Sequence, residues 1–266
     1  MAYPYRGSRA LVTGASSGIG ADVAVALAQR GVNVALTARR REQLDVVAER
    51  CRDHGVSAHV LPADLGDLDA AGAVGRRAIE ALGGLDLLVN SAGAPRRVHA
   101  ARLTFAQVEE TMRVNYLGTM AVIYAVLPHM LEKKKGRIVN VSSIAGRLPA
   151  PREMAYAASK AALTMASEVL AEDLMGTGIR IHVIHPGVID TPLWDAEGQE
   201  ASPFRGAPTP VGEVTAAILK QLDTGAFDAY VPRKFRLAVI SKPLLGDRFV
   251  ASSSNYDRKR VPEAYR

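Results

Sequence analysis

The chain has 266 residues, of which 48% are hydrophobic and 23% are charged, which is enough for one α/β domain with a sizeable core. Its net charge of +6 lies in residues 233–266, which hold nine Lys or Arg and three acids. The neutral remainder argues against nucleic-acid binding. The single cysteine, Cys51, excludes an internal disulfide framework. No apolar leader is visible and no apolar run approaches the ~20 residues of a membrane span, so we expect a soluble, cytoplasmic protein.

The first predicted strand, 9–13, ends in the turn Gly14-Ala15-Ser16-Ser17-Gly18-Ile19-Gly20, and a helical pattern follows through Arg30. Strand, glycine turn and helix in this order are typical of the opening of a dinucleotide-binding unit. The glycines let the backbone approach a pyrophosphate, and the helix N-terminus offers free N–H groups to its phosphates. The spacing is Gly-x-x-x-Gly-x-Gly, which differs from the common Gly-x-Gly-x-x-Gly fingerprint.

The second predicted strand, 32–37, is followed by Ala38-Arg39-Arg40-Arg41. The common pattern has an acid here that binds the ribose hydroxyl of NAD. A forked Arg guanidinium binds the 2′-phosphate of NADP instead. We therefore expect NADP rather than NAD, with Arg39 as the main contact and Arg40 as an assistant. The alternative is a solvated helix start.

The remaining elements alternate along the chain. Strands are predicted at 58–62, 85–89, 137–141 and 179–185, and helices to about 54, over 66–82, over 104–130 and to about 175. Such alternation predicts an α/β fold of the Rossmann type, doubly wound, with a mostly parallel sheet of about seven strands and helices on both faces. We expect a single domain over 1–266, with 233–266 as a basic C-terminal extension.

Tyr156 and Lys160 stand four residues apart in the last of these helices. That spacing places both side chains on one face, one turn apart. A nearby ammonium favours the phenolate and lowers the pKa of a phenol, which would suit Tyr156 to general acid–base catalysis near neutral pH. The alternative is an ordinary helical Tyr with a solvated Lys.

A set of motifs spans most of the chain in a fixed order: Thr13-Gly14-x-x-x-Gly18-x-Gly20, Asp64, Asn90-x-Ala92-Gly93, Asn115, Ser143, Tyr156-x-x-x-Lys160 and Pro186-Gly187. By these residues the chain resembles the short-chain dehydrogenase/reductase family over roughly 8–232. Ser143 precedes Tyr156 by thirteen residues, the interval usual in the family, which favours Ser143 over Ser142. Ser91 departs from the pattern, since the family often has a second Asn there.

The resemblance implies an oxidoreductase that transfers a hydride between NADP(H) and a ketone or secondary alcohol. Tyr156 would give or take the proton, and Ser143 would bind the reacting oxygen. Lys160 would hold the nicotinamide ribose, and Asn115 would hold a water that links Lys160 to solvent. The implied cofactor contacts are Gly14, Ser16, Ser17, Gly18, Ile19, Gly20, Arg39, Arg40, Asp64, Leu65, Asn90, Ala92, Gly93, Tyr156, Lys160, Pro186, Gly187, Ile189 and Thr191.

The substrate side is less specified. The irregular stretch 191–210 is a candidate lid and contains Trp194 and Phe204. Candidate apolar walls are Leu148, Pro149, Pro151 and Met154, with surface packing as the alternative. Arg96 and Arg97 would meet an acidic substrate or be solvated. His99 and His129 lack metal-ligand spacing, so no metal is expected.

Two alternative functions are epimerase or dehydratase chemistry on the same fold and a regulatory protein that binds NADP without turnover. The resemblance also implies a homodimer or homotetramer through the helices that hold Asn115 and Tyr156. Residues 235–245 form a basic, apolar segment whose positions 237, 240 and 244 share one helical face. This segment would contact an anionic membrane, wall a site for an apolar substrate, pack on a neighbouring subunit or cap the domain's own sheet.

Overall fold

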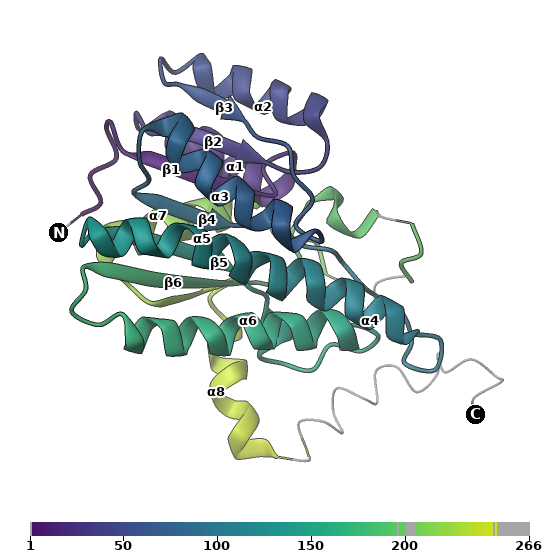
Figure 1. Ribbon diagram of the computed structural model, residues 1–266. Helices are drawn as coiled ribbons and strands as arrows, with labels where there is room; N and C mark the ends of the chain where they lie inside the picture. Colours follow the sequence, from purple (N-terminus) through teal and green to yellow (C-terminus); the bar gives the residue numbers. More distant parts are fainter. Residues whose placement is uncertain (1, 196, 201–205, 247, 249–266) are drawn as a thin grey trace.

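The computed structural model describes residues 2–195, 197–200, 206–246 and 248. Its strands form one seven-stranded sheet in the order β3-β2-β1-β4-β5-β6-β7, and every neighbouring pair is parallel (Figure 1). The strands are β1 (Arg9–Thr13), β2 (Asn33–Thr37), β3 (Ala58–Val60), β4 (Leu87–Asn90), β5 (Gly136–Val141), β6 (Ile179–Pro186) and β7 (Asp228–Val231). This confirms the predicted Rossmann-type α/β fold, with a sheet that is parallel throughout.

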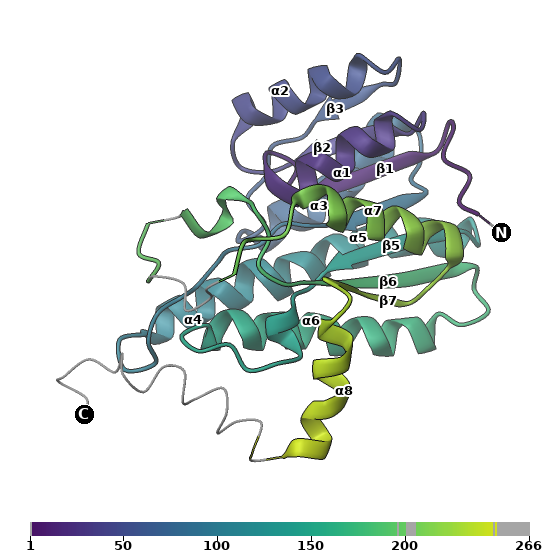
Figure 2. The ribbon, with the colours of Figure 1, turned by 180° about the vertical axis from the view of Figure 1, so that it is seen from behind.

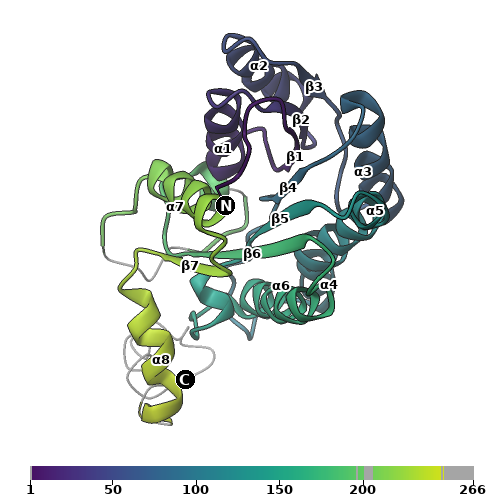
Figure 3. The ribbon, with the colours of Figure 1, turned by 90° about the vertical axis from the view of Figure 1, so that its left-hand side faces the viewer.

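Helices cover both faces of the sheet. They are α1 (Gly18–Ala28), α2 (Arg41–Arg52), α3 (Leu68–Leu82), α4 (Phe105–Met112), α5 (Thr119–Glu132), α6 (Met154–Asp173), α7 (Val211–Thr224) and α8 (Phe235–Leu245). Viewed along the sheet, α1, α2 and α7 lie on one side and α3, α5 and α6 on the other (Figure 3). Each side has its own apolar cluster, one holding Leu27, Leu44 and Ile218 and the other Val74 and Ile123.

The strand order reverses between β1 and β4, which are neighbours in space although β2 and β3 come between them in sequence. In such sheets ligands bind beyond the carboxyl ends of the strands at this switch point. The ends here are Thr13 and Asn90, which are paired in register. The glycine turn and the Asn90–Gly93 turn therefore meet at one edge of the sheet.

The predicted helix over 104–130 is three helical segments in succession: α4, a π-helical segment (Arg113–Gly118) and α5. Together they make a stretch, Phe105–Glu132, that by length and composition alone could cross a membrane. The expectation that no apolar run approaches that length is therefore wrong, because residues 114–131 contain no Asp, Glu, Lys or Arg. In this fold α5 packs along α3.

The basic segment after β7 forms α8, which projects away from the sheet and the other helices (Figure 2). None of its residues is buried, and Leu237, Ile240 and Leu244 are exposed. The interpretation of this segment as a cap on the domain's own sheet is therefore wrong for α8. The rest of the extension, at 247 and 249–266, lies outside the described residues.

Candidate functional site

The glycine turn is held tightly against the neighbouring turn of β4. Thr13 Oγ1 accepts hydrogen bonds from the backbone N–H groups of Ser91 and Ala92, both at 3.1 Å. Gly14 has a φ of +66°, and a Cβ on it would lie 2.7 Å from the Ala92 backbone. Only glycine adopts this backbone conformation readily and also lets the Ala92 backbone come so close. Because Gly14 has no side chain, the space above the start of α1 stays open.

A cavity of about 570 Å³ opens beside this turn. Among the implied cofactor contacts, those that line it are Gly14, Ser16, Ser17, Gly18, Ile19, Arg39, Arg40, Asp64, Leu65, Ala92, Gly93 and Thr191. Asn90 does not line it, because its Nδ2 is buried and donates to Asn140 Oδ1 at 2.8 Å. Asn90 thus holds β4 to β5, and its implied cofactor contact stays a prediction.

The basic residues after β2 are not equivalent. Arg40 Nη2 donates to Ser16 Oγ at 3.3 Å and to Ser17 Oγ at 3.2 Å. Arg39 lines the same cavity without such a hydrogen bond among those described. A guanidinium and two hydroxyls together are donors suited to an anion. The structure therefore brings Arg40 together with Ser16 and Ser17 and places Arg39 in the lining of the same cavity.

A second cavity, of about 680 Å³, contains Ser143, Tyr156 and Lys160 in its lining. Tyr156 is buried, and its side chain and that of Ser143 are hydrogen-bonded. Lys160 Nζ lies 5.9 Å from the Tyr156 ring centroid. The structure thus brings the three side chains together, with Tyr156 and Lys160 on one face of α6.

The protonation of this group differs from the sequence-based expectation. Burial raises the pKa of Tyr156 above its usual value, and the charge of Glu153 raises it further, while Ser143 and Arg97 lower it. Burial also lowers the pKa of Lys160 to about 8, and its Nζ donates to Val141 O at 2.8 Å. The predicted net lowering of the Tyr156 pKa by Lys160 is therefore wrong for the protein chain alone. Its phenol keeps its proton at neutral pH.

The side chain of Asn115 makes three hydrogen bonds within the protein. Its Oδ1 accepts from Ala94 N at 2.6 Å, and its Nδ2 donates to Ala94 O at 3.0 Å and to Ser159 Oγ at 2.9 Å. It lies in the π-helical segment, and Asn115 and Lys160 face the same point beside Gly93. Both N–H groups of the amide are thus used within the protein, while Oδ1 can accept a second hydrogen bond. The water link stays a prediction.

Ser142 has a structural role. Its Oγ donates to Lys160 O at 3.0 Å and lies 2.7 Å from Thr164 Oγ1. It therefore holds β5 against α6. Ser143 Oγ accepts a hydrogen bond from Ala145 N at 3.1 Å and lies 3.5 Å from Pro186 O. Unlike Ser142, it also interacts with the Tyr156 side chain, which supports the choice made from the interval.

The two cavities share part of their lining. Ile19, Ser91, Gly93, Thr191 and Leu193 belong to both. Pro186, Gly187 and Ile189, which the sequence placed at the cofactor, line the larger cavity. The remaining implied contact, Gly20, approaches the Gly14 carbonyl so closely that a side chain would collide with it, so it shapes the turn rather than the cavity wall.

The larger cavity is bounded mainly by apolar side chains. Leu148, Pro149 and Pro151 line it, as expected for walls, and Trp194 of the candidate lid stretch lines it too. Met154 is 53% exposed and is not among the lining residues, because the first turn of α6 points it to solvent. Phe204 lies outside the described residues. Phe235, at the start of α8, is a wall residue that the sequence reasoning treated only as part of the tail.

Arg97 is the largest departure from the sequence prediction, because it is neither solvated nor free. It is buried and forms an ion pair with Glu153, 2.9 Å from Nη2 to Oε1. Its guanidinium also lies 3.8 Å from the Trp194 ring centroid, and that ring meets Tyr156 edge-on at 5.2 Å. Glu153 was missed, although it stands three residues before Tyr156, a spacing that places both side chains on one side of a helix.

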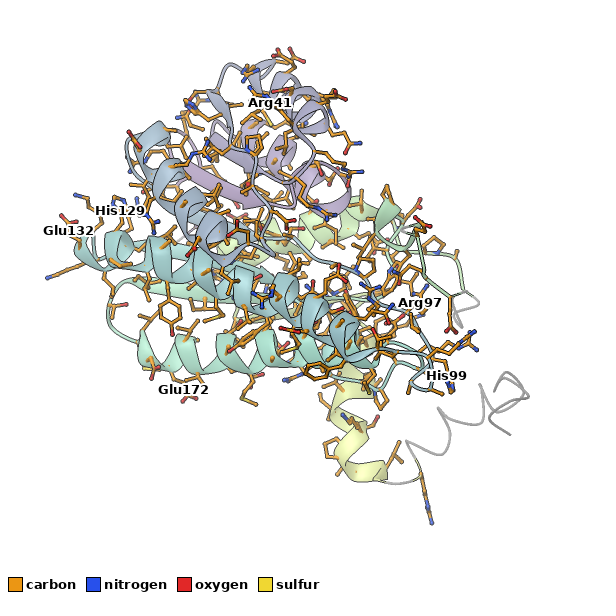
Figure 4. All side chains as sticks on the ribbon, turned by 45° about the vertical axis from the view of Figure 1, so that its right-hand side comes forward. Arg41, Arg97, His99, His129, Glu132 and Glu172 are labelled. Atoms are coloured by element: carbon orange, nitrogen blue, oxygen red, sulfur yellow. The ribbon has the colours of Figure 1, made fainter. Side chains whose placement is uncertain are left out.

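Arg96 has an ion pair with Glu110, 2.6 Å from Nη2 to Oε2, so neither arginine is an unpaired site for an acidic substrate. His99 and His129 lie at opposite ends of the molecule (Figure 4). Among the described residues, no group of three or more His, Cys, Asp or Glu is placed to hold a metal ion.

Comparison with known proteins decides the family. The model of the short chain dehydrogenase family matches residues 8–202. The chain belongs to this family. It is 39% identical over 194 residues to an uncharacterised oxidoreductase of Mycobacterium tuberculosis, covering 71% of this chain and 57% of that one. It is 37% identical over 190 residues to a fatty acyl-CoA reductase of Acinetobacter baylyi, covering 71% and 64%. The chain therefore spans less than two thirds of the length of these relatives.

Solved structures of the family agree with the fold. A short chain dehydrogenase from Burkholderia cenocepacia, in complex with NADP, is 34% identical and superposes with a TM-score of 0.74 over 82% of this chain and 91% of that one. A short chain dehydrogenase/reductase from Burkholderia phymatum, in complex with NAD, has a TM-score of 0.84 at 23% identity over 91% and 95%. The second likeness shows the fold alone.

Proposed function

We propose that the protein is an NADP-dependent oxidoreductase that interconverts an apolar ketone and its secondary alcohol. The observation that carries the proposal is the position of Tyr156, Ser143 and Lys160 in an apolar cavity that adjoins the cavity of the glycine turn. A carbonyl in the first and a dinucleotide in the second would meet where the two linings are shared. Membership of the short chain dehydrogenase family, together with the 34% identical neighbour in complex with NADP, supports a nicotinamide cofactor.

The residues around the glycine turn fit such a cofactor. Gly14 and Gly18 have left-handed backbone and leave room for a pyrophosphate at the N-terminus of α1, which favours anions. Ser16, Ser17 and Arg40 would hold the 2′-phosphate. The bound cofactor supplies the hydride chemistry, and the chain supplies the rest.

In the reductive direction, Tyr156 would donate its proton to the carbonyl oxygen. Its raised pKa suits it to this role, because the phenol stays protonated until the reaction creates a strong base beside it. Ser143 would donate a hydrogen bond to the same oxygen and stabilise the charge that develops there. Lys160 would hold the nicotinamide ribose, and its ammonium would stabilise the Tyr156 phenolate formed after proton transfer.

The cavity supports an uncharged, largely apolar substrate. Its charged lining residues among those described are Arg97, Glu153 and Lys160, and the first two neutralise each other. Burying a charged substrate group without a partner would be costly. One relative bears the name fatty acyl-CoA reductase, which is compatible with a long apolar substrate.

The exposed apolar residues of α5 and α6 support the expected homo-oligomer. They include Tyr124, Leu131, Met165 and Val169, on the two helices that follow or hold Asn115 and Tyr156. A homodimer or homotetramer through this face, and a cytoplasmic location, stay predictions. Light scattering of the purified protein would test the first.

The proposed reaction is tested by following NADPH consumption with a panel of steroids, acyl thioesters, sugars and small ketones. Tyr156→Phe removes the acid and keeps the ring, so turnover should fall by ~100-fold or more while NADPH affinity stays nearly unchanged. A wild-type protein that binds NADPH and turns over no carbonyl would support the regulatory alternative. Wild-type turnover by the Phe variant would remove Tyr156 from the mechanism.

A further inference from the structure

Helix α8 has two different faces. On the inner face, Phe235 lines the larger cavity and packs so closely on Gly187 that a Cβ there would lie 2.5 Å from its ring. Lys242 Nζ, also on this side, donates to Arg147 O at 3.0 Å. The outer face presents Leu237, Ile240 and Leu244, which are 72%, 56% and 84% exposed. Their spacing of three and then four residues makes them one continuous stripe.

Basic side chains border this stripe. Lys234 stands one turn before Leu237, and Arg236 stands one turn before Ile240; both are exposed. Residues 233–246 contain four Lys or Arg and no acid. Within the described part of the chain, no acid forms an ion pair with Arg233, Lys234 or Arg236. The outer face is therefore both apolar and cationic.

This combination matches the surface of an anionic lipid bilayer. Leucine and isoleucine side chains gain from burial among acyl chains, and Lys or Arg at their border attract lipid phosphates. A second copy of α8 is a poorer occupant, because apposing two such faces would bring Lys234 and Arg236 of both copies together without acids to neutralise them. The body of the protein is close to neutral, so the attraction is concentrated on this helix.

We infer that α8 is a membrane-docking helix. Leu237, Ile240 and Leu244 enter the interface of an anionic bilayer, and Lys234 and Arg236 contact its phosphates. Because Phe235 on the opposite face is part of the cavity wall, docking holds that wall next to the bilayer, where an apolar substrate is concentrated. The binding itself does not depend on the proposed reaction.

Co-sedimentation of the full chain with vesicles tests this inference. Vesicles of phosphatidylcholine with phosphatidylglycerol are compared with pure phosphatidylcholine, at about 0.05 M and about 0.5 M NaCl, since salt screens the attraction. The full chain should bind the anionic vesicles at low salt and lose most of that binding at high salt. Lys234→Ala and Arg236→Ala should each weaken binding about fivefold.

The apolar contribution is tested by the triple variant L237E/I240E/L244E, which should lose at least about tenfold in affinity for anionic vesicles. Val46→Glu is the matched control, because Val46 is 62% exposed on α2, and it should bind like the wild type. None of the three α8 residues lines the cavity, so thermal melting and NADPH turnover of a water-soluble ketone should be unchanged.

Three results would overturn the inference. The first is a wild-type chain that ignores anionic vesicles at low salt. The second is a triple variant that still binds them as tightly as the wild type. The third is a wild type that does not bind vesicles and a triple variant whose mass by light scattering is lower than that of the wild type. That result would assign the outer face to contact with a second copy of the chain. A wild-type chain that binds anionic vesicles but turns over no carbonyl would count against the proposed reaction and leave the docking helix unaffected.

Discussion

Arg97 and Glu153 form an ion pair beside Tyr156, with 2.9 Å between Nη2 and Oε1 and side chains only 5% and 11% exposed. Arg97 comes from the segment after β4, and Glu153 comes directly before α6. The same guanidinium lies over the Trp194 ring. One buried pair therefore ties three segments around the proposed proton donor, and a buried pair loses much when one partner is removed.

The first prediction follows from the charge of Glu153. That charge raises the pKa of Tyr156, and Arg97 lowers it. Glu153→Gln removes the anion and leaves the cation, so the pKa of Tyr156 should fall. Alcohol oxidation needs the phenolate, so the rise of kcat/KM with pH should move to lower pH. Reduction needs the phenol and should lose activity at lower pH than in the wild type.

The pH profiles of both directions are the measurement. Glu110→Gln is the control. It removes the partner of Arg96, 2.6 Å from Nη2 to Oε2, and Glu110 is not among the groups that shift the pKa of Tyr156. Its profile should overlay that of the wild type. A Glu153→Gln profile that is unchanged, or moved to higher pH, would contradict the assigned role of this charge.

The second prediction concerns Trp194 as a wall of the substrate cavity. Trp194 lines the larger cavity and is not among the residues of the smaller one. Trp194→Ala should raise KM for an apolar ketone about tenfold or more, since an aromatic contact is lost, and should leave NADPH affinity unchanged. Trp194→Phe should retain most of the affinity. Equal weakening of NADPH and ketone by the Ala variant would place Trp194 at the cofactor instead.

The third prediction separates the arginines after β2. Arg40→Ala should weaken NADPH about tenfold or more and change NADH little, because only NADPH has the 2′-phosphate and charge-assisted hydrogen bonds to it are strong. Arg39→Ala should have the smaller effect, the reverse of the order expected from sequence. Arg41→Ala is the matched control, since Arg41 is 72% exposed and pairs with Asp45. The measurement is the affinity of each variant for both cofactors. Equal losses for NADPH and NADH would rule out a 2′-phosphate site.

The sequence predicts most of the fold because the signals that set it are local. Apolar strands, glycine turns and amphipathic helices alternate, and alternation alone implies parallel crossovers. The position of β7 was not predicted from the sequence, because this strand is four residues long and two of them are only partly buried. The stretch 114–131 was misjudged because its polar Asn, Tyr, Thr and His residues interrupt the apolar run without adding charge.

The site is predicted less completely, because its electrostatics depend on contacts between distant segments. The position of Tyr156 beside Lys160 follows from a helical spacing, but the burial of both side chains does not. The pairing of Arg97 with Glu153 joins residues 56 apart, so neither could be assigned a partner beforehand. For the same reason the proposal of Arg40, rather than Arg39, as the main contact of the 2′-phosphate depends on contacts with Ser16 and Ser17 that the sequence does not show.

The last prediction concerns acid stability and two buried histidines of β6. Burial lowers the pKa of His182 to about 4 and that of His185 to about 4. His182 Nδ1 lies 2.7 Å from Ala226 O, while His185 stacks on Tyr230. In the unfolded chain each imidazole binds its proton near pH ~6.5. At these two sites the folded protein thus binds fewer protons than the unfolded chain between about pH 4 and 6.5.

Linkage then requires the free energy of unfolding to fall as the pH drops through this window. The stability that neutral histidines contribute is fully present above pH ~6.5 and is lost toward pH ~4, by roughly 2–4 kcal/mol for each residue. His182→Asn keeps a donor to Ala226 O and removes the titration. Urea unfolding between about pH 4.5 and 7 should show its slope against pH reduced by up to about 1.4 kcal/mol per unit. His54→Asn, at an exposed position, should leave the slope unchanged, and an equal effect of both variants would show that burial of His182 is not the cause.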